Sequence, residues 1–402
     1  MNQLPGPCEI AASEPTSIAA DLRFDDSILG SAFFAICLPP PVHGQSLVNA
    51  SVIDAALKFG GSAKIEIVDI GPGPHGVGFN YHLTRMARVA LAAVTLAQGG
   101  AKKDRQFYTV FESGFGIAYN FFLIGIARML GYKVILHHHT SKHTLSRQRR
   151  FALLGRLAGS SSVNVVLSEE MADNMRLLYP SASNIMVSQN ACHIPDNDVG
   201  APARLGSNAL RVGYLSNLCK EKGLNIVLEA AAKCRDRGLE LTFVFAGPAA
   251  GAKAAKDLAQ GRVRLGDSIE VIGPVRDAAK EAFFKSIDVF LFPTRYRYEA
   301  QPLVILEAMS YGLPVITTNC GYVEELVGRQ GIVLDVDGAL PEAIVAELEK
   351  LITTHEYSRW TAVEVKSYFR RLRATALGQL RELMDVLFAV KHDDEVGRAP
   401  AP

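Results

Sequence analysis

Short runs of apolar residues alternate with longer stretches of helical periodicity along most of the chain. In the first half, the runs typical of buried strands are AFFAICL from Ala32, KIEIVDI from Lys64, QFYTVF from Gln106, KVILH from Lys133, VNVVLS from Val163 and IMVSQ from Ile185. In the second half they are LRVGYLS from Leu210, LTFVFAG from Leu241, IEVIG from Ile269, VFLFP from Val289, PVITT from Pro314 and GIVLD from Gly331. Helical segments such as YHLTRMARVALAAVTLA separate them, and this alternation predicts parallel α/β units.

A stretch rich in Pro, Gly, Asp and Asn, from His193 to Asn208, divides these two halves and has the composition of a linker. We therefore expect two doubly wound domains, residues 29–200 and 201–355, with ligands in the cleft between them. Residues 356–390, which hold Trp360, form a long amphipathic pattern and are expected to pack as helices across that cleft. Residues 1–28 are expected to be irregular, and residues 391–402 to be a disordered tail.

Composition narrows the class of protein. The formal net charge of the 402 residues is +1, so a dedicated nucleic-acid binder is not expected. The six cysteines are scattered without metal-ligand spacing, which favours free thiols in a reducing, cytoplasmic compartment. No signal-peptide pattern opens the sequence. The most apolar stretch, 119–136, is interrupted by charges and predicts a buried helix followed by a strand rather than a membrane span.

The string YEAQPLVILEAMSYGLPVI, from Tyr298, is the most specific in the chain. Pro302 suits the first position of a helix, and Gly312 suits its end. Glu299 is then expected just before the helix N-terminus and Glu307 about a turn and a half inside. A carboxylate beside the backbone N–H groups of a helix N-terminus suits a ligand that carries both hydroxyls and phosphates.

This string resembles the donor-binding motif of family 4 glycosyltransferases, E-G-F-G-x-x-x-x-E-A-M-A-x-G-x-P-V. The resemblance implies a GT-B fold and a retaining transfer of a sugar from a nucleotide diphosphate. It implies that Glu299 lies against the donor sugar and that Glu307 hydrogen-bonds the ribose. The residues between them that would line the donor site are Ala300, Gln301, Leu303 and Val304. The sequence departs from the motif at Ala300, Gln301 and Pro302.

Two further segments resemble the same family. LPPPVHGQS, from Leu38, is similar to its glycine loop, so Gly44, Gln45 and Ser46 are candidates for binding the diphosphate. A plain proline-rich turn is the alternative. LSNLCKEKG, from Leu215, resembles G-R-L-x-x-E-K-G, which makes Lys222 the cation for the leaving group.

Asn217 stands where that family segment has its arginine, and an amide cannot offset a phosphate charge. Either Lys222 works with backbone dipoles, or Arg295 or Arg297 supplies the missing charge. Gly273 and Val275, in VIGPV, correspond to the backbone that lies against the base.

Three histidines end the strand in VILHHHTSKH, from Val134. A family histidine near the acceptor follows the equivalent strand, which favours His139. A structural role and a metal site are the alternatives. Because neighbouring side chains on an extended segment alternate in direction, only His137 and His139 can share a side. We expect no metal.

Two other patterns in the sequence are less specific. Residues 71–76 fit G-x-G-x-x-G, but Pro72 and Pro74 lack the N–H groups that a pyrophosphate needs, so a loop on the acceptor side is preferred. Residues 128–156 carry seven Lys or Arg and no acid. This is either a solvated basic face or a contact with an anionic membrane or a lipid-linked diphosphate.

The resemblance thus implies a glycosyltransferase without a cofactor that joins a sugar to a saccharide or lipid-linked acceptor in the synthesis of polysaccharides or glycoconjugates. It would be cytoplasmic, or peripheral at the inner face of a membrane. The alternatives are a nucleotide-sugar binding subunit without turnover, and a GT-B epimerase or phosphorylase.

Overall fold

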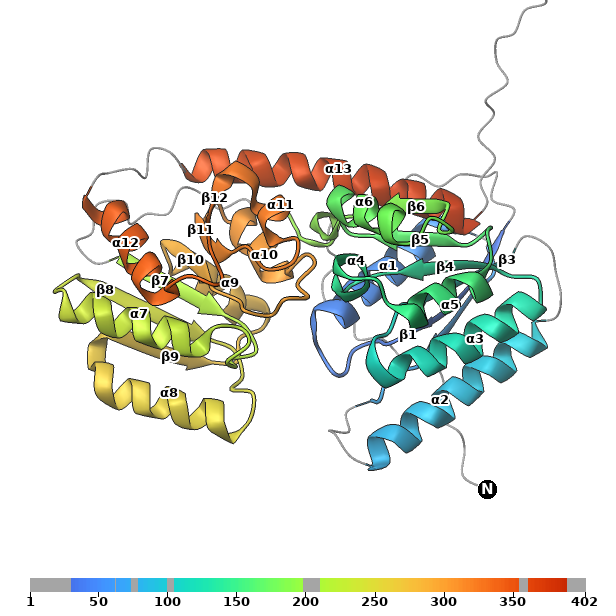
Figure 1. The fold of residues 1–402 in the computed structure, drawn as a ribbon, viewed down its shortest axis with the longest axis horizontal. Helices are drawn as coiled ribbons and strands as arrows, with labels where there is room; N and C mark the ends of the chain where they lie inside the picture. Colours follow the sequence, from blue (N-terminus) through green and yellow to red (C-terminus); the bar gives the residue numbers. More distant parts are fainter. Residues whose placement is uncertain are drawn as a thin grey trace, which may run out of the picture.

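The computed structural model describes residues 30–61, 63–73, 79–99, 105–197, 210–353 and 361–388. Within these residues, two parallel sheets of six strands form two α/β domains (Figure 1). Each apolar run identified above forms a strand, so the predicted doubly wound fold is confirmed. The expectations for the N-terminal segment, most of the linker, Trp360 and the tail lie outside the described residues.

The first domain contains the sheet β2-β1-β3-β4-β5-β6, whose order reverses between β1 and β3. Its strands are β1 (Ser31–Ile36), β2 (Ile65–Asp69), β3 (Arg105–Val110), β4 (Lys133–His137), β5 (Val163–Val166) and β6 (Asn184–Val187). Its helices are α1 (Gly44–Phe59), α2 (Phe79–Gln98), η2 (Gly114–Gly116), α3 (Ile117–Met129), α4 (Lys142–Leu145), α5 (Arg149–Ala158), α6 (Glu169–Leu178) and η3 (Asn190–His193).

The strands of the first sheet are apolar at successive positions, so both faces of the sheet carry apolar side chains, and both are buried. Phe33 belongs to the core shared with α2, α3 and α5, whereas its neighbour Phe34 belongs to the core shared with α1 and α13 (Ala362–Phe388). This alternation follows from the two-residue period of a strand. The helices α2, α3 and α5 therefore form one layer, and α1 with the end of α13 forms the other.

The second domain contains the sheet β12-β11-β10-β7-β8-β9, whose order reverses between β7 and β10. Its strands are β7 (Leu210–Leu215), β8 (Leu241–Ala246), β9 (Ile269–Gly273), β10 (Val289–Phe292), β11 (Val315–Thr318) and β12 (Gly331–Leu334). Its helices are α7 (Leu224–Asp236), α8 (Ala252–Leu265), η4 (Gly266–Ser268), α9 (Asp277–Lys285), α10 (Leu303–Ser310), α11 (Val323–Val327), η5 (Gly328–Gln330) and α12 (Leu340–Thr353).

The long helix α13 extends over both domains (Figure 1). Its first half packs against α10 of the second domain, and its second half packs against η3, β1 and β3 of the first. Its last described residue, Phe388, accepts a hydrogen bond from Gly30 N over 3.0 Å. The end of α13 thus lies next to β1 in the first domain, and the helix ties the two domains together. None of the described helices, α13 included, is long and apolar enough to cross a membrane.

Candidate active site

The loops after β7 and β10 meet where the strand order of the second sheet reverses, the position at which open parallel sheets bind ligands. Arg295 donates its backbone N–H to Glu221 O over 2.8 Å, which joins the two loops. Gly223 has a φ of +92°, and a Cβ there would lie 2.3 Å from Pro293 O. This close approach requires glycine, so the G of the K-G pair in the sequence motif has a structural reason.

Lys222 and Glu299 are brought together at this point. The Lys222 ammonium forms an ion pair with Glu299 Oε1, and the same oxygen accepts a hydrogen bond of 3.1 Å from Thr294 Oγ1. The Glu299 side chain is 9% exposed and that of Lys222 is 27% exposed. The Lys222 Nζ also lies 5.1 Å from the centroid of the Tyr296 ring. Lys222 and Glu299 are therefore paired with each other, with the acid buried and the lysine partly open to solvent.

The turn after β11 supports the backbone of Glu299. Gly321 has a φ of +59°, and a Cβ there would lie 1.9 Å from Glu299 O. The next residue, Tyr322, donates its N–H to the same oxygen over 3.2 Å. The position of Glu299 thus depends on a glycine at 321.

The second acid of the motif, Glu307, has its own cation. Its Oε1 pairs with Lys280 on α9, while its buried Oε2 has no hydrogen-bond partner among the described residues. Burial raises the pKa of Glu307, and the nearby Lys280 opposes that rise. A buried acceptor atom without a donor is costly, so this oxygen is suited to a hydroxyl of a ligand.

Helix α10 differs from the sequence prediction at its start. Pro302 was expected as the first helical residue, but its ψ of 120° is extended and the helix begins at Leu303. The prediction is wrong by one residue because proline fixes only φ, and its ψ stays free. Glu307 lies within the first turn and a half, as predicted, and Gly312, with a φ of +73°, lies just beyond the helix end.

The residues between the two glutamates are mostly buried against the first domain. Ala300 and Gln301 are buried. Gln301 Oε1 accepts the backbone N–H of Asn190 over 2.8 Å, and Asn190 Nδ2 donates to Gln301 O over 3.0 Å. Leu303 and Val304 are half-buried and pack against the core that α10 shares with α1 and α13. In this structure Gln301 connects the domains through η3.

The candidate glycine loop opens α1 opposite α10. A Cβ on Gly44 would lie 3.9 Å from Leu303 Cδ1, so this loop contacts the second domain. His43 and Ser46 form a capping box, in which Ser46 N donates to His43 Nδ1 over 3.2 Å. The amide of Ser46 is therefore already used by the cap. Gln45 is half-buried at the same helix N-terminus.

Other candidates lie around the second sheet. Asn217 is exposed on the loop after β7, and Arg295 and Arg297 are exposed on the loop after β10. Gly273 ends β9 with a φ of +77°, and its carbonyl accepts a hydrogen bond from the loop after β8. Val275 is half-buried against the core. All five positions lie at or just after the carboxyl ends of strands.

The three consecutive histidines alternate in direction, as predicted. The rings of His137 and His139 lie 4.2 Å apart, and His137 Nδ1 is 2.5 Å from the hydroxyl of Tyr108. Burial, with a smaller effect of His193, lowers the pKa of His139 to about 3. The buried Nε2 of His139 has no partner among the described residues, so a neutral imidazole nitrogen is available at this position.

His138 points the other way, into the core under α5. Its Nε2 lies 3.1 Å from Asn164 Oδ1, and its ring packs 4.6 Å from that of His143. The His143 ring also lies 4.7 Å from that of Phe151. Within the described residues, no group of three or more His, Cys, Asp or Glu side chains could hold a metal ion.

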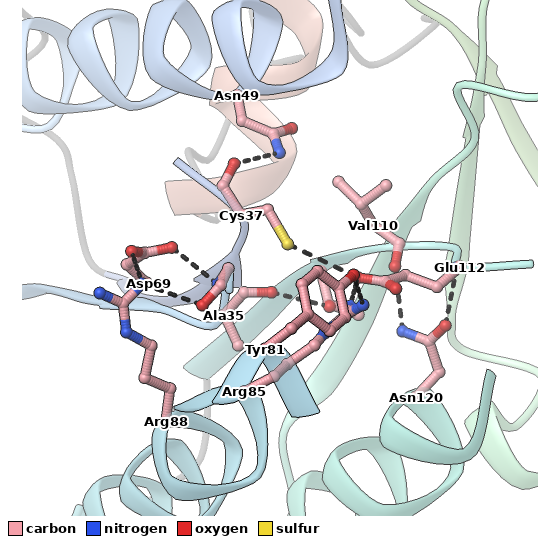
Figure 2. A network of polar contacts seen from close by, with 12 residues as sticks. Ala35, Cys37, Asn49, Asp69, Tyr81, Arg85, Arg88, Val110, Glu112 and Asn120 are labelled. Atoms are coloured by element: carbon pink, nitrogen blue, oxygen red, sulfur yellow. Dashed lines mark hydrogen bonds and ion pairs between the residues drawn. The ribbon is translucent and has the colours of Figure 1, made fainter. Parts of the chain in front are cut away.

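A network of charges that the sequence patterns did not predict lies at the carboxyl ends of β1, β2 and β3 (Figure 2). Two arginines of α2 reach inward. Arg85 pairs with Glu112 after β3, and Arg88 pairs with Asp69 at the end of β2. The Cys37 thiol donates a hydrogen bond to Glu112 over 3.6 Å. Burial, and to a smaller extent the negative charge of Glu112, raises the pKa of Cys37 to about 12.

This network lies where the strand order of the first sheet reverses, which is the binding position on that sheet. Gly116 packs closely beside it, because a Cβ there would lie 2.8 Å from Glu112 Cβ and would displace the Glu112 side chain. A polar residue directly after a buried strand, such as Glu112, was the one signal in the sequence. The partner arginines were not predictable, because they come from a different part of the chain.

Two residues of the turn and helix after β11 reach across to the first domain. Tyr322 donates its hydroxyl to Thr144 Oγ1 over 2.8 Å and accepts from Asn174 Nδ2 over 3.1 Å. Glu325 Oε1 accepts the backbone N–H groups of Glu169 and Glu170 at the N-terminus of α6. The domains are thus held together directly beside the Lys222–Glu299 pair.

Comparisons with known proteins agree with this picture. Residues 209–354 match the family model described as Glycosyl transferases group 1. The chain is 27% identical over 180 residues to O-antigen biosynthesis glycosyltransferase WclY of Escherichia coli, which is 43% of this chain and 47% of that protein. It is 28% identical over 195 residues to D-inositol 3-phosphate glycosyltransferase of Paenarthrobacter aurescens, 45% of this chain and 46% of that protein. The chain thus spans about half the length of these curated relatives.

The solved structure of Anabaena HepE in complex with UDP and glucose is similar across nearly its whole length. It has a TM-score of 0.61 at 17% identity and covers 88% of this chain and 99% of that one. Together with the two parallel sheets, this likeness shows a two-domain α/β GT-B fold.

Proposed function

We propose that this chain is a retaining glycosyltransferase of the family 4 type, which moves a sugar from a nucleotide diphosphate to a saccharide or lipid-linked acceptor in polysaccharide biosynthesis. The observation that carries the proposal is the Lys222–Glu299 ion pair at the switch point of the domain that matches the glycosyltransferase model. The names of the relatives, among them an O-antigen glycosyltransferase, support the pathway. Their different acceptors leave the acceptor of this chain to experiment.

The donor would bind along the carboxyl ends of the second sheet. Oε2 of Glu307, which is buried and has no donor among the described residues, accepts a ribose hydroxyl, because such a carboxylate oxygen gains most from one. The base lies against the backbone near Gly273. The diphosphate reaches Lys222 and the N-terminus of α1, where the amides of Gly44 and Gln45 add a positive dipole.

In the transfer step, the bond between the anomeric carbon and the diphosphate oxygen breaks while the acceptor oxygen attacks from the same face. The proton of the acceptor passes to the departing phosphate oxygen, and the anomeric configuration is retained. Lys222 neutralises the charge that develops on the diphosphate, the largest contribution that this site can make. Glu299, released from Lys222, hydrogen-bonds the sugar hydroxyls. No metal is part of the proposal.

The acceptor would lie on the first domain, between His139 and the Arg85–Glu112 pair. His139 offers a neutral ring nitrogen for a hydroxyl. The ion pair supplies donors and acceptors side by side, which suits a polyhydroxylated ligand. The reaction is assigned to the cytoplasm because the cysteines in the described residues are unpaired thiols. A lipid-linked acceptor would bring the enzyme to the inner face of a membrane.

A second candidate function is a nucleotide-sugar binding subunit without turnover, or an epimerase on the same fold. The exposed amide of Asn217, where the family motif has a cation, is the observation that supports the binding subunit. All of these functions require binding of the nucleotide sugar, so a binding assay does not distinguish them. Transfer of the sugar to an acceptor is expected only of the transferase.

The test is a thermal-shift screen of the purified chain against UDP, GDP, ADP and their sugars, first without metal and then with magnesium. A nucleotide present at about a hundred times its Kd should stabilise the fold by about 2.7 kcal/mol. We expect one nucleotide family to do so without metal, followed by transfer of radiolabelled sugar to an acceptor. Stabilisation with neither transfer nor conversion of the nucleotide sugar favours the binding subunit, and conversion of the nucleotide sugar without an acceptor favours the epimerase. If no nucleotide stabilises the protein, the assignment of Glu299, Glu307 and Lys222 to the donor site is wrong.

A further inference from the structure

The loop between β10 and α10 presents an exposed aromatic ring beside the Lys222–Glu299 pair. Tyr296 is 39% exposed, and it is the one exposed aromatic side chain in the described part of the second domain. Tyr322, the aromatic residue that packs against the first domain, is by contrast 1% exposed. An exposed ring on a loop at the ligand-binding edge of a sheet is typical of a binding residue rather than of packing.

Contacts of the ring, the hydroxyl and the backbone hold Tyr296 in place. The ring of Tyr298 packs edge-on against it, with 5.7 Å between the centroids and 86° between the planes. The hydroxyl of Tyr296 is hydrogen-bonded to the side chain of Thr140 in the first domain. In the backbone, Glu299 N donates to Tyr296 O over 3.2 Å. The orientation of the ring is thus set before a ligand binds, which lowers the entropy that binding costs.

Tyr296 lies between the two candidate binding regions. Glu299, on the same loop, is the candidate residue for the donor sugar, and the hydroxyl of Tyr296 bonds the residue that follows His139, the candidate for the acceptor. The backbone joins the same two loops, since Ser141 N donates to Tyr298 O over 3.4 Å. The donor sugar and the acceptor must meet between these loops for transfer, so the Tyr296 ring borders the place of reaction.

The face of the Tyr296 ring suits positively polarised groups. The Lys222 ammonium lies 5.1 Å from the ring centroid, where the negative face of the aromatic ring attracts a cation. The oxygens of a sugar polarise its C–H bonds, so the hydrogens carry a partial positive charge and are attracted to the same face. A diphosphate bound to Lys222 draws the ammonium away from the ring and leaves this face to a sugar.

We propose that Tyr296 is a positioning residue for the acceptor, and that the acceptor is a saccharide whose pyranose ring stacks a face of C–H bonds on this side chain. This role rests on the proposed transfer and names the class of acceptor, as opposed to an alcohol or a lipid phosphate without sugar. The buried Nε2 of His139, which has no partner among the described residues, receives a hydroxyl of the same sugar. An apolar wall with a few polar groups fixes the orientation of a ligand in this way.

The donor sugar is the other ring near Tyr296. The hydrogen bond to Thr140 favours the acceptor, because it fastens Tyr296 to the domain that carries His139 rather than to the domain on which the donor binds. The contact with Lys222 adds an order of events, since the diphosphate competes with the ring for the same ammonium. We therefore expect the saccharide to bind after the nucleotide.

Saturation-transfer difference NMR of the full chain tests the proposal without catalysis. The probes are the methyl pyranosides of glucose, galactose, mannose and N-acetylglucosamine, with glycerol and farnesyl phosphate as compounds that lack a pyranose. Each is measured with and without UDP, GDP or ADP, whichever stabilises the chain. We expect saturation of the C–H protons on one face of at least one pyranoside, stronger with the nucleotide than without it.

Two substitutions separate stacking from packing. Tyr296→Phe keeps the aromatic face, so it should retain the saturation pattern. Tyr296→Leu keeps apolar bulk without an aromatic face, so it should bind the pyranoside about three- to tenfold more weakly, with the thermal shift by the nucleotide unchanged. Phe122→Ala, an exposed ring on α3, is the matched control and should change neither. A residue that only packs is replaced by leucine as well as by phenylalanine.

Equal pyranoside binding by Tyr296→Leu and the parent chain would overturn the role of the ring. No signal from any pyranoside, with or without a signal from glycerol or farnesyl phosphate, would overturn the class of acceptor. Weaker binding of the nucleotide sugar by Tyr296→Leu, with pyranoside binding intact, would assign the ring to the donor sugar instead. Failure of the proposed function is seen separately, as a parent chain that no nucleotide stabilises.

Discussion

The ammonium group of Lys222 is paired with the carboxylate of Glu299, 77 residues further along the chain, at the point where the strand order of the second sheet reverses. Each charge is the partner of the other, and Thr294 adds a hydrogen bond to the same carboxylate oxygen. A phosphate that reaches Lys222 must therefore compete with Glu299. Binding of a nucleotide at Lys222 would also release the carboxylate for a sugar hydroxyl, which couples the two halves of a donor.

This competition gives the first prediction. Glu299→Gln removes the competing charge and keeps the side-chain shape, so the nucleotide diphosphate should bind up to about fivefold more tightly, given ~1 kcal/mol for a partly exposed pair. Transfer should nevertheless fall by about a hundredfold or more, because the sugar loses its charged acceptor. Calorimetric titration and a transfer assay measure the two effects separately. Glu221→Gln, exposed beside Lys222, is the control and should change neither. Weaker nucleotide binding by Glu299→Gln would contradict the competition.

The second prediction concerns Glu307 and the ribose. Wild-type protein should bind the ribonucleoside diphosphate about ten to a hundred times more tightly than its 2′,3′-dideoxy analogue, as expected for hydrogen bonds to a carboxylate. Glu307→Ala should bind both analogues alike and weakly, because the unpartnered Oε2 is gone. Competition binding with the two analogues measures the ratio. If Glu307→Ala keeps the preference for the ribonucleotide, the ribose is recognised elsewhere.

A third prediction tests how Glu299 is held. Gly321→Ala places a Cβ where Glu299 O now lies, so we expect a loss of stability of about 1–3 kcal/mol and a loss of transfer. Gly238→Ala is the matched control, since Gly238 has a φ of +71° but no atom within 4 Å of its Cβ position. It should show only the backbone cost, about 1 kcal/mol, with transfer intact. Urea denaturation and the transfer assay together decide, and equal effects of both substitutions on transfer would exclude a specific role for Gly321.

These residues also show how far the sequence could predict the molecule. Apolar runs located the strands, because both faces of each sheet are buried and a buried strand is apolar throughout. The motif located Glu299, Glu307 and Lys222. It did not locate Lys280 or Arg85, because an ion pair between distant helices depends on tertiary packing and leaves no local pattern. Gln301 illustrates the same limit, since its main contact, with Asn190, belongs to the other domain.

A fourth prediction concerns acid stability. Both ring nitrogens of His143 are buried without a partner among the described residues, and burial lowers its pKa well below 6.5. Below pH 6.5 the unfolded chain takes up a proton that the folded chain does not. Stability should therefore fall as pH drops, by about 1.4 kcal/mol per pH unit for this residue. His143→Phe, which fits among aromatic rings, should be at least as stable at neutral pH and should flatten this decline.

Urea denaturation at neutral pH and at about pH 5 measures the difference in slope. Exposed His82→Asn serves as the control and should leave the pH dependence of the parent chain unchanged. A parallel decline in His143→Phe would show that His143 does not contribute to acid sensitivity, and that the other buried histidines account for it.

The last prediction concerns domain closure. The hydroxyl of Tyr322 is hydrogen-bonded to Thr144 and Asn174 of the first domain. Its ring is buried in the core of that domain, so Tyr322→Phe should keep the packing and lose only the hydrogen bonds, at about 1 kcal/mol. The domains should then open more often, water should reach the bound donor, and hydrolysis should rise several-fold relative to transfer. The ratio of free sugar to transferred sugar measures this.

Tyr311→Phe is the control. Tyr311 is stacked on Phe284 within the second domain, so its substitution should leave the ratio unchanged. If Tyr322→Phe also leaves it unchanged, these hydrogen bonds do not control the access of water, and closure depends on α13 and Glu325 instead.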